Sequence, residues 1–299
     1  MAKENNFDQF YTNPLTAKKL TSIFTEEIKK LGYQKINFLE PSAGTGNFCQ
    51  AVKELAKINP FISKKILAFD IEPKSNKENV IKTNFLKVPL TKYLKKEKRN
   101  NYVVIGNPPF GKKGKLALNF VNKSAKYIDT IGFILPLTFR RWSIQSKLNK
   151  DLQLIYDINL EPNSFLANDK IYSLNACFQI WTKRKTEQKD LRIKQRPITK
   201  HPDFEMFLHN NTQPTLKYFQ KDKYNWDFAV VRQGFYDYNQ RIETEKQLFK
   251  NRQYIFFKSK NEPTKQKLLQ LDFAKLAQKN TITPGFGKHD VVVAYNDLC

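Results

Sequence analysis

A short stretch near the middle of the chain places an amide, two prolines and an aromatic ring directly after an apolar run. It reads YVVIG followed by NPPF over residues 102–110. Proline fixes φ and lacks an N–H, so Pro108 and Pro109 leave nearby carbonyl groups without backbone partners. If the Asn107 side-chain oxygen and the Pro108 carbonyl each accept one N–H from an amine on an aromatic ring, the nitrogen is drawn towards tetrahedral geometry. Its lone pair then becomes nucleophilic without a strong general base, and Phe110 would stack on the ring. A proline-stiffened turn without a chemical role is the alternative.

A second small-residue loop, FLEPSAGTGNF over residues 38–48, follows another apolar run. Five of the ten glycines of the chain lie in these two stretches or within four residues after the first of them, at positions 44, 46, 106, 111 and 114. Glycine is used where the backbone turns tightly or approaches a ligand. The loop lacks the third glycine of a dinucleotide motif and the Lys-Ser or Lys-Thr of a phosphate loop. Glu40, directly before the loop, suggests instead a cationic or amine-bearing ligand, and S-adenosylmethionine, with an ammonium and a sulfonium, fits.

A third apolar run, in the segment ILAFDIEP over residues 66–73, is followed directly by an acidic residue, Asp70. An acid in the place of Asp70 accepts both ribose hydroxyls of an adenosine in dinucleotide folds. Taken alone, Asp70 could equally begin a surface turn. The spacing from the Gly44 loop favours the ribose role.

The elements that must position these residues alternate along the first 180 residues. Short apolar runs predict buried strands at 36–39, 66–69, 102–105, 131–135 and 176–181, and helical spacing predicts helices at 47–58 and 115–127. Alternating strands and helices predict an α/β fold with a parallel sheet covered on both faces. Since ligands bind at the carboxyl ends of such strands, the three motifs should meet at one edge.

The pattern breaks at residues 183–200, which are rich in basic residues and run into Pro197 and Pro202. We therefore expect a catalytic, cofactor-binding domain over 1–185 and a smaller mixed domain over 186–299. Within 186–299 the sequence predicts one helix around 265–278 and a flexible basic loop at 284–289. Its aromatic residues between Tyr224 and Arg241 are interleaved with arginines, a mixture that suits nucleic-acid contact.

Composition limits the partners of the protein. Its 52 Lys and Arg against 28 Asp and Glu give a net charge of +24, which indicates a polyanion such as nucleic acid. AT-rich codon usage could also enrich lysine. The three cysteines and three histidines have no ligand-like spacing, so we expect no metal site. With no signal peptide and no run long enough to span a membrane, we expect a cytoplasmic protein.

At these motifs the sequence resembles the adenine-N6 amino methyltransferases, over roughly residues 7–182. The resemblance implies the class I, Rossmann-like methyltransferase fold and S-adenosylmethionine as cofactor. It implies catalysis by Asn107, Pro108 and Phe110, with Pro109, Arg140, Arg141 and Phe178 near the target base. The cofactor contacts that it implies come from Tyr11, Thr12, Asn13, Pro14, Glu40, Ser42, Gly44, Gly46, Asp70, Ile71, Asn84 and Phe85. Asn84 stands where the family usually has Asp.

The order of the motifs is similar to that of the gamma class, in which target recognition lies after the catalytic domain. The leading interpretation is therefore a DNA adenine methyltransferase, with a restriction endonuclease as an expected partner in such systems. RNA, ribosomal or other, is the closest alternative substrate. Glutamine methylation of release factors is disfavoured, because their enzymes resemble a design with a helical domain before the cofactor loop and with Tyr in place of Phe110. A basic binding module without catalysis is the non-enzymatic alternative.

Overall fold

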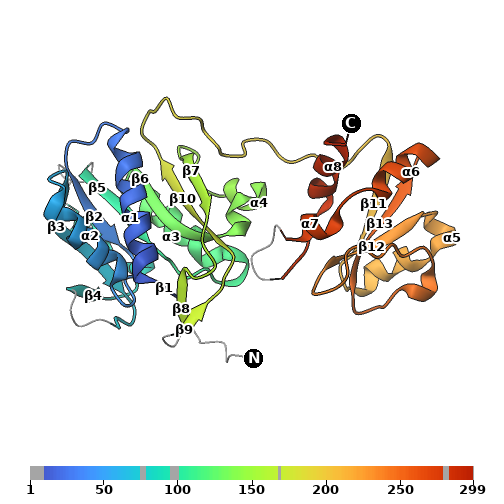
Figure 1. Cartoon of the computed structure of the whole chain (residues 1–299), viewed down its shortest axis with the longest axis horizontal. Coiled ribbons are helices and arrows are strands. Elements are labelled where there is room, and N and C mark those ends of the chain that lie inside the picture. The colour runs from blue at the N-terminus through green and yellow to red at the C-terminus, as the bar shows by residue number, and fades with distance from the viewer. Residues whose placement is uncertain (1–9, 75–78, 95–100, 168–169, 279–282, 299) are drawn as a thin grey trace. The chain divides into compact units, whose positions relative to one another are not determined.

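The computed structural model describes residues 10–74, 79–94, 101–167, 170–278 and 283–298 (Figure 1). The chain divides into two compact units, 1–194 and 195–299. The division falls nine residues beyond the boundary expected at 185.

A seven-stranded sheet forms the centre of the first unit. Its strands are β2 (Ile36–Glu40), β3 (Ile62–Asp70), β4 (Val80–Lys82), β5 (Tyr102–Gly106), β6 (Thr130–Pro136), β7 (Gln153–Asn159) and β10 (Ala176–Thr182). The order across the sheet is β4-β3-β2-β5-β6-β10-β7, and β10 alone runs antiparallel to its neighbours. Without β10 this is the order 3-2-1-4-5-6 of the doubly wound, Rossmann-like fold. The predicted fold class is confirmed, although the direction of β10 was not expected.

Helices cover both faces of this sheet, as Figure 1 shows for α1 (Pro14–Lys29), α2 (Asn47–Ile58) and α3 (Lys115–Ala125). Alternate residues of one strand enter different cores. Val103 and Ile105 of β5 pack with α1 and α2, whereas Val104 packs with α3. Burial of both faces explains why these strands read as unbroken apolar runs. A short helix, α4 (Trp142–Gln145), follows β6.

A small second sheet holds the amino-terminal segment. It consists of β1 (Tyr11–Thr12), β8 (Phe165–Ala167) and β9 (Lys170–Tyr172), in the order β1-β8-β9. The pairing sets Tyr11 opposite Leu166 and Thr12 opposite Phe165. This sheet fixes where the chain enters the large unit before α1 begins.

The basic stretch 183–200, in which the strand–helix pattern breaks, is partly bound to the first unit. The Arg192 guanidinium donates to the carbonyls of Gln145 and Leu152, both at 2.8 Å, and the Leu191 N–H donates to the Leu154 carbonyl at 2.8 Å. Leu154 in turn donates to Asp190. These bonds keep residues up to 194 with the first unit, which is why the division comes later than composition suggested.

The second unit has a three-stranded antiparallel sheet of β11 (Phe204–His209), β12 (Phe228–Gln233) and β13 (Gln253–Ser259), with β13 in the middle. Its helices are α5 (Lys221–Tyr224), α6 (Glu262–Leu269), α7 (Phe273–Ala277) and α8 (Lys288–Asn296).

Two expectations for the second unit were wrong. The single helix expected at 265–278 is two helices, because the Asp272 side chain accepts the Lys275 N–H and starts α7 anew. The stretch expected to be a flexible basic loop instead buries Phe286 in the core and begins α8 at Lys288. The Lys288 ammonium donates to the Met206 carbonyl.

Within the described parts of the chain, none of the helices is long and apolar enough to cross a bilayer. In the same parts, no three His, Cys, Asp or Glu side chains come together as metal ligands would.

Candidate active site

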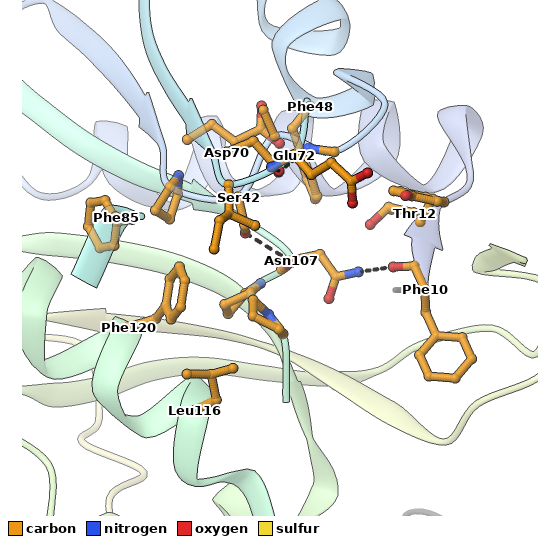
Figure 2. Close-up of a pocket in the computed structure, with 18 of the residues that line it drawn as sticks. Phe10, Thr12, Ser42, Phe48, Asp70, Glu72, Phe85, Asn107, Leu116 and Phe120 are labelled. Carbon is orange, nitrogen blue, oxygen red and sulfur yellow. Dashed lines mark hydrogen bonds between the residues drawn. The ribbon is translucent and has the colours of Figure 1, made fainter. Parts of the chain in front are cut away.

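A cavity of about 590 Å³ lies at the carboxyl ends of β2, β3 and β5 (Figure 2). It brings together thirteen residues that the sequence had singled out from five separate stretches. These are Tyr11, Thr12, Glu40, Ser42, Gly44, Asp70, Ile71, Asn84, Phe85, Asn107, Pro108, Pro109 and Phe110. Parallel strands end at the same edge of a sheet, so motifs far apart in the chain meet there.

Asn107 is held in one orientation by two hydrogen bonds, both drawn in Figure 2. Its side-chain N–H₂ donates to the Phe10 carbonyl at 2.8 Å, and its backbone carbonyl accepts the Ser42 hydroxyl at 3.1 Å. The first bond fixes which end of the amide is oxygen, because only the nitrogen can donate to a carbonyl. The Asn107 Oδ1 has no protein partner among the described residues and belongs to a side chain that lines the cavity. It is an acceptor ready for a substrate N–H.

The amino-terminal segment lies against this site through backbone contacts. Phe10 supplies the carbonyl that orients Asn107, and its ring stacks on Tyr172 of β9 with centroids 4.8 Å apart. The Asn47 side chain, at the start of α2, donates to the Thr12 carbonyl at 2.8 Å. Sequence reasoning assigned no role to Asn47 or Tyr172, because a side chain bonded to a distant carbonyl leaves no motif.

The glycine loop after β2 is shaped by its neighbours. Gly44 has φ of +54°, and a Cβ at this position would lie 3.0 Å from two carbons of the Tyr11 ring. Its N–H donates to Asp70 Oδ2 at 2.7 Å, while Asp70 Oδ1 accepts the Glu72 N–H at 2.7 Å. Asp70 therefore ties the end of β3 to the loop. Each of its oxygens keeps a further lone pair for a hydroxyl.

The charge of the described cavity lining is opposite to that of the chain. Among the described residues that line the cavity, Glu40, Asp70 and Glu72 are charged, and none is Lys or Arg. Glu40 is 2% exposed, and its Oε2 accepts the Cys49 thiol at 2.8 Å. Burial raises the pKa of Tyr11 above its usual value, and the adjacent carboxylates of Asp70 and Glu72 add to this, while Lys74 opposes it. Such a cavity attracts cationic ligands and repels phosphates.

The far side of the cavity is apolar and aromatic. The Phe85 and Phe120 rings stack with centroids 5.3 Å apart, and both line the cavity together with Leu116. Asn84 Oδ1 accepts the Leu86 N–H at 3.0 Å and so begins the short helix η1 (Phe85–Lys87). The contact of Asn84 with a cofactor amine, expected for this position, stays a prediction. It would use the second lone pair of Asn84 Oδ1.

Three predicted cofactor residues lie beside the cavity instead of lining it. Asn13 caps α1, its Oδ1 accepting the Leu15 N–H at 2.9 Å, and Pro14 is the first residue of that helix. Gly46 precedes α2 with φ of +82°. These residues position the lining residues next to them, Thr12 and Asn47.

Of the four residues expected near a target base, Pro109 lines the cavity, whereas Arg140, Arg141 and Phe178 do not. Arg140 donates to both oxygens of Asp157, with its Nε 3.0 Å from each, and to Asn159 Oδ1 at 2.6 Å. Arg141 is half-buried and precedes α4. Phe178 has no exposed surface and packs edge-on against Phe24, so its position is that of a core residue of β10.

No family model and no curated protein matches this sequence. Solved structures are similar in fold. A protein from Listeria monocytogenes assigned to the class I S-adenosylmethionine-dependent methyltransferases is 13% identical over 65% of this chain and 66% of its own, with a TM-score of 0.46. The methyltransferase subunit of a type I restriction-modification system from Streptococcus thermophilus is 15% identical over 60% of this chain and 45% of its own, with a TM-score of 0.43.

The 23S rRNA methyltransferase ErmE is 14% identical over 60% of this chain and 71% of its own, with a TM-score of 0.39. The chain thus spans just under two thirds of the Listeria protein and less than half of the Streptococcus subunit. At these identities the similarity concerns the Rossmann-like fold and carries nothing about the reaction.

Proposed function

We propose that this protein transfers a methyl group from S-adenosylmethionine to the N6 amino group of adenine in DNA. The observation that carries the proposal is the orientation of Asn107. The Phe10 carbonyl holds its N–H₂, which leaves the amide oxygen as an acceptor at the edge of an acidic cavity.

The lining of the cavity fits S-adenosylmethionine. Its described part holds three carboxylates and no basic side chain, which suits a ligand that bears an ammonium and a sulfonium and disfavours a dinucleotide with its phosphates. A cavity of about 590 Å³ falls in the range of roughly 300–1,000 Å³ that holds ligands of this size. Asp70 is available to the ribose hydroxyls, and the apolar side formed by Ile71 and Phe85 is available to the adenine ring.

The residues of the chain would act by positioning the amine. Asn107 Oδ1 and the Pro108 carbonyl each accept one N–H of the adenine amino group, which turns its lone pair away from the ring. Phe110 stacks on the base, and Pro109 limits the space beside it. When bound, S-adenosylmethionine supplies the electrophilic methyl group. Because the amine is activated by two preorganised acceptors, no residue of the cavity has to serve as a strong base.

A polyanionic substrate is supported by the net charge of +24. Since the cavity repels phosphate, only the neutral base would enter it, so a duplex substrate must extrude the adenine. DNA is favoured over RNA by the order of the motifs, with the second unit after the catalytic one. The structure of the cavity suits either polymer.

The test is transfer of labelled methyl groups from S-adenosylmethionine to duplex DNA, single-stranded DNA and ribosomal RNA, followed by identification of the modified nucleoside. We expect N6-methyladenine in DNA. Asn107→Ala should lower turnover by about 10²- to 10³-fold, the usual cost of one preorganised transition-state hydrogen bond, with cofactor affinity nearly unchanged.

Asn101→Ala is the matched control, because Asn101 is exposed and precedes the same strand, β5. Label in RNA alone would keep the chemistry and move the substrate to the alternative class. Equal turnover by Asn107→Ala and Asn101→Ala would refute the catalytic assignment.

A further inference from the structure

The structure sorts the aromatic residues of the second unit into two groups. Trp226, Phe228 and Tyr238 are 5% exposed or less and build its cores. Phe235 is 79% exposed, Phe249 53% and Tyr236 41%. Large apolar side chains are seldom left this open in a cluster unless the surface binds something.

One arginine, Arg252, contacts two of these exposed rings, those of Tyr236 and Phe249. The Arg252 guanidinium lies 4.7 Å from the centroid of the Tyr236 ring and 4.3 Å from that of the Phe249 ring. We call Phe235, Tyr236, Phe249 and Arg252 the aromatic–arginine cluster. Its members come from the segment that follows β12 and from the turn that precedes β13, two segments brought together because Gln233 pairs with Gln253 in the sheet.

Both segments of the cluster are held in shape by the fold. Gly234 has φ of +125°, and a Cβ there would lie 2.3 Å from the Tyr236 ring, so the ring rests directly on the glycine. The Tyr238 hydroxyl lies 2.6 Å from the Gly234 carbonyl. On the other side, the buried His209 ring contacts the Lys250 carbonyl at 3.2 Å. The exposed rings are therefore presented by anchored backbone.

The surroundings of the cluster carry positive charge and amide groups. Lys246, Lys250 and Arg252 pair with no carboxylate in the described part of the chain. Exposed amides lie in the same two segments, at Asn239, Gln240 and Asn251. The acids between β12 and β13 are Asp237, whose carboxylate accepts the Asn239 N–H, Glu243, and Glu245, whose carboxylate accepts the Lys221 N–H.

The other arginines of the region are used internally. Arg241 donates to the carbonyls of Leu271 and Asn239, both at 2.9 Å, and Arg232 donates to Asn210. Arg252 differs from them, because its guanidinium packs on the exposed rings of Tyr236 and Phe249. Rings, a planar cation, amides and unpaired lysines together match the chemistry of an unpaired nucleobase and its phosphate.

We infer that the aromatic–arginine cluster is a nucleic-acid contact site, at which an unpaired base stacks on Phe235 and the adjoining phosphate meets Arg252. The inference deepens the proposed function by naming residues that hold its substrate, and it rests on that function for the choice of polymer. Every base has a π face, so this site gives affinity with little sequence selectivity.

The test uses the full chain and fluorescently labelled DNA, single-stranded and duplex, with binding followed by anisotropy over a series of salt concentrations. Phe235→Ala should weaken binding of the single strand by about 5- to 100-fold, the range for loss of one stacked base, with an unchanged salt dependence. Arg252→Ala should weaken binding and also lower the slope of log affinity against log salt by about 0.7.

Ile198→Ala is the matched control, since Ile198 is 69% exposed, apolar and in the same unit. Cofactor binding by calorimetry should be the same in all variants. Binding by Phe235→Ala that equals that of Ile198→Ala would overturn the inference. If the wild type binds DNA through Phe235 but transfers no methyl group, the contact site stands and the proposed function fails. If methyl transfer to DNA proceeds equally well without Phe235, the proposed function stands and the contact site fails.

Discussion

Replacement of Gly44 by alanine tests the geometry of the cofactor loop. Gly44 has φ of +54°, a region that costs a residue with a Cβ about 1–2 kcal/mol. The new methyl group would also stand 3.0 Å from two carbons of the Tyr11 ring, closer than side chains normally approach. Tyr11 lines the cavity, so the ring must move into the space of the ligand or away from it.

Gly32→Ala separates these two effects. Gly32 has φ of +72°, so alanine suffers the same backbone strain there, but nothing lies within 4 Å of its Cβ. Both variants should lose roughly 1–2 kcal/mol of unfolding free energy. Only Gly44→Ala should lose cofactor affinity, by about 5- to 30-fold if the displacement of Tyr11 costs a further ~1–2 kcal/mol in the bound state.

The assay is calorimetric titration with S-adenosylmethionine, together with urea unfolding of the free proteins. Affinity within twofold of wild type for Gly44→Ala would refute the inference that Tyr11 and the loop form one wall of the cofactor site. An equal loss of affinity in Gly32→Ala would refute it as well, because the effect would then come from general destabilisation.

Two further predictions concern stability, one at Arg192 of the first unit and one at Tyr238 of the second. Arg192→Ala removes a guanidinium that donates to the carbonyls of Gln145, Leu148, Asn149, Lys150 and Leu152, and should lower the unfolding free energy in urea by roughly 2–4 kcal/mol. Lys194→Ala, which removes only an exposed pair with Asp190, should cost less than about 0.5 kcal/mol, and equal costs would contradict the anchoring role of Arg192. Burial raises the pKa of Tyr238 to about 12; the unfolded chain therefore loses this proton first, near pH 10, and stability falls as the pH rises from about 10 to 12. Tyr238→Phe, which cannot ionise, should be less stable than wild type at neutral pH and should approach it above pH 10, and parallel stability curves in this pH range would argue against a raised pKa.

Burial on both faces made most of the large sheet predictable. Strands such as Val103-Val104-Ile105 alternate between two cores, so they are apolar throughout and stand out in the sequence. β7 was missed because it is an edge strand in which Gln153, Asp157 and Asn159 interrupt the apolar pattern. The direction of β10 was also missed, since a run such as ACFQIWT satisfies a central position in either orientation.

The site was predictable where chemistry depends on side chains at strand ends. Glu40, Asp70 and Asn107 were found from the residue type and its place after an apolar run. The contacts that orient Asn107 and Asp70 were not, because the Phe10 carbonyl and the Gly44 N–H are backbone groups that leave no mark in the sequence. The ion pair of Arg140 was not foreseen for a related reason: its partner Asp157 lies on a strand that the sequence did not reveal.

The distribution of charge would direct the cofactor and the nucleic acid of the proposed reaction to different parts of the protein. The chain has a net charge of +24, yet the charged residues in the described lining of its cavity are acids. A cationic cofactor is attracted to the acidic cavity, and a polyanionic substrate is attracted to the positive charge of the rest of the chain. The two would not compete for one site, because each is repelled where the other is attracted. The only part of a nucleic acid that can enter the cavity without this repulsion is the uncharged base. If Asn107 and Pro108 accept the amino group as proposed, electrostatics would admit the reacting atom and keep the phosphates outside.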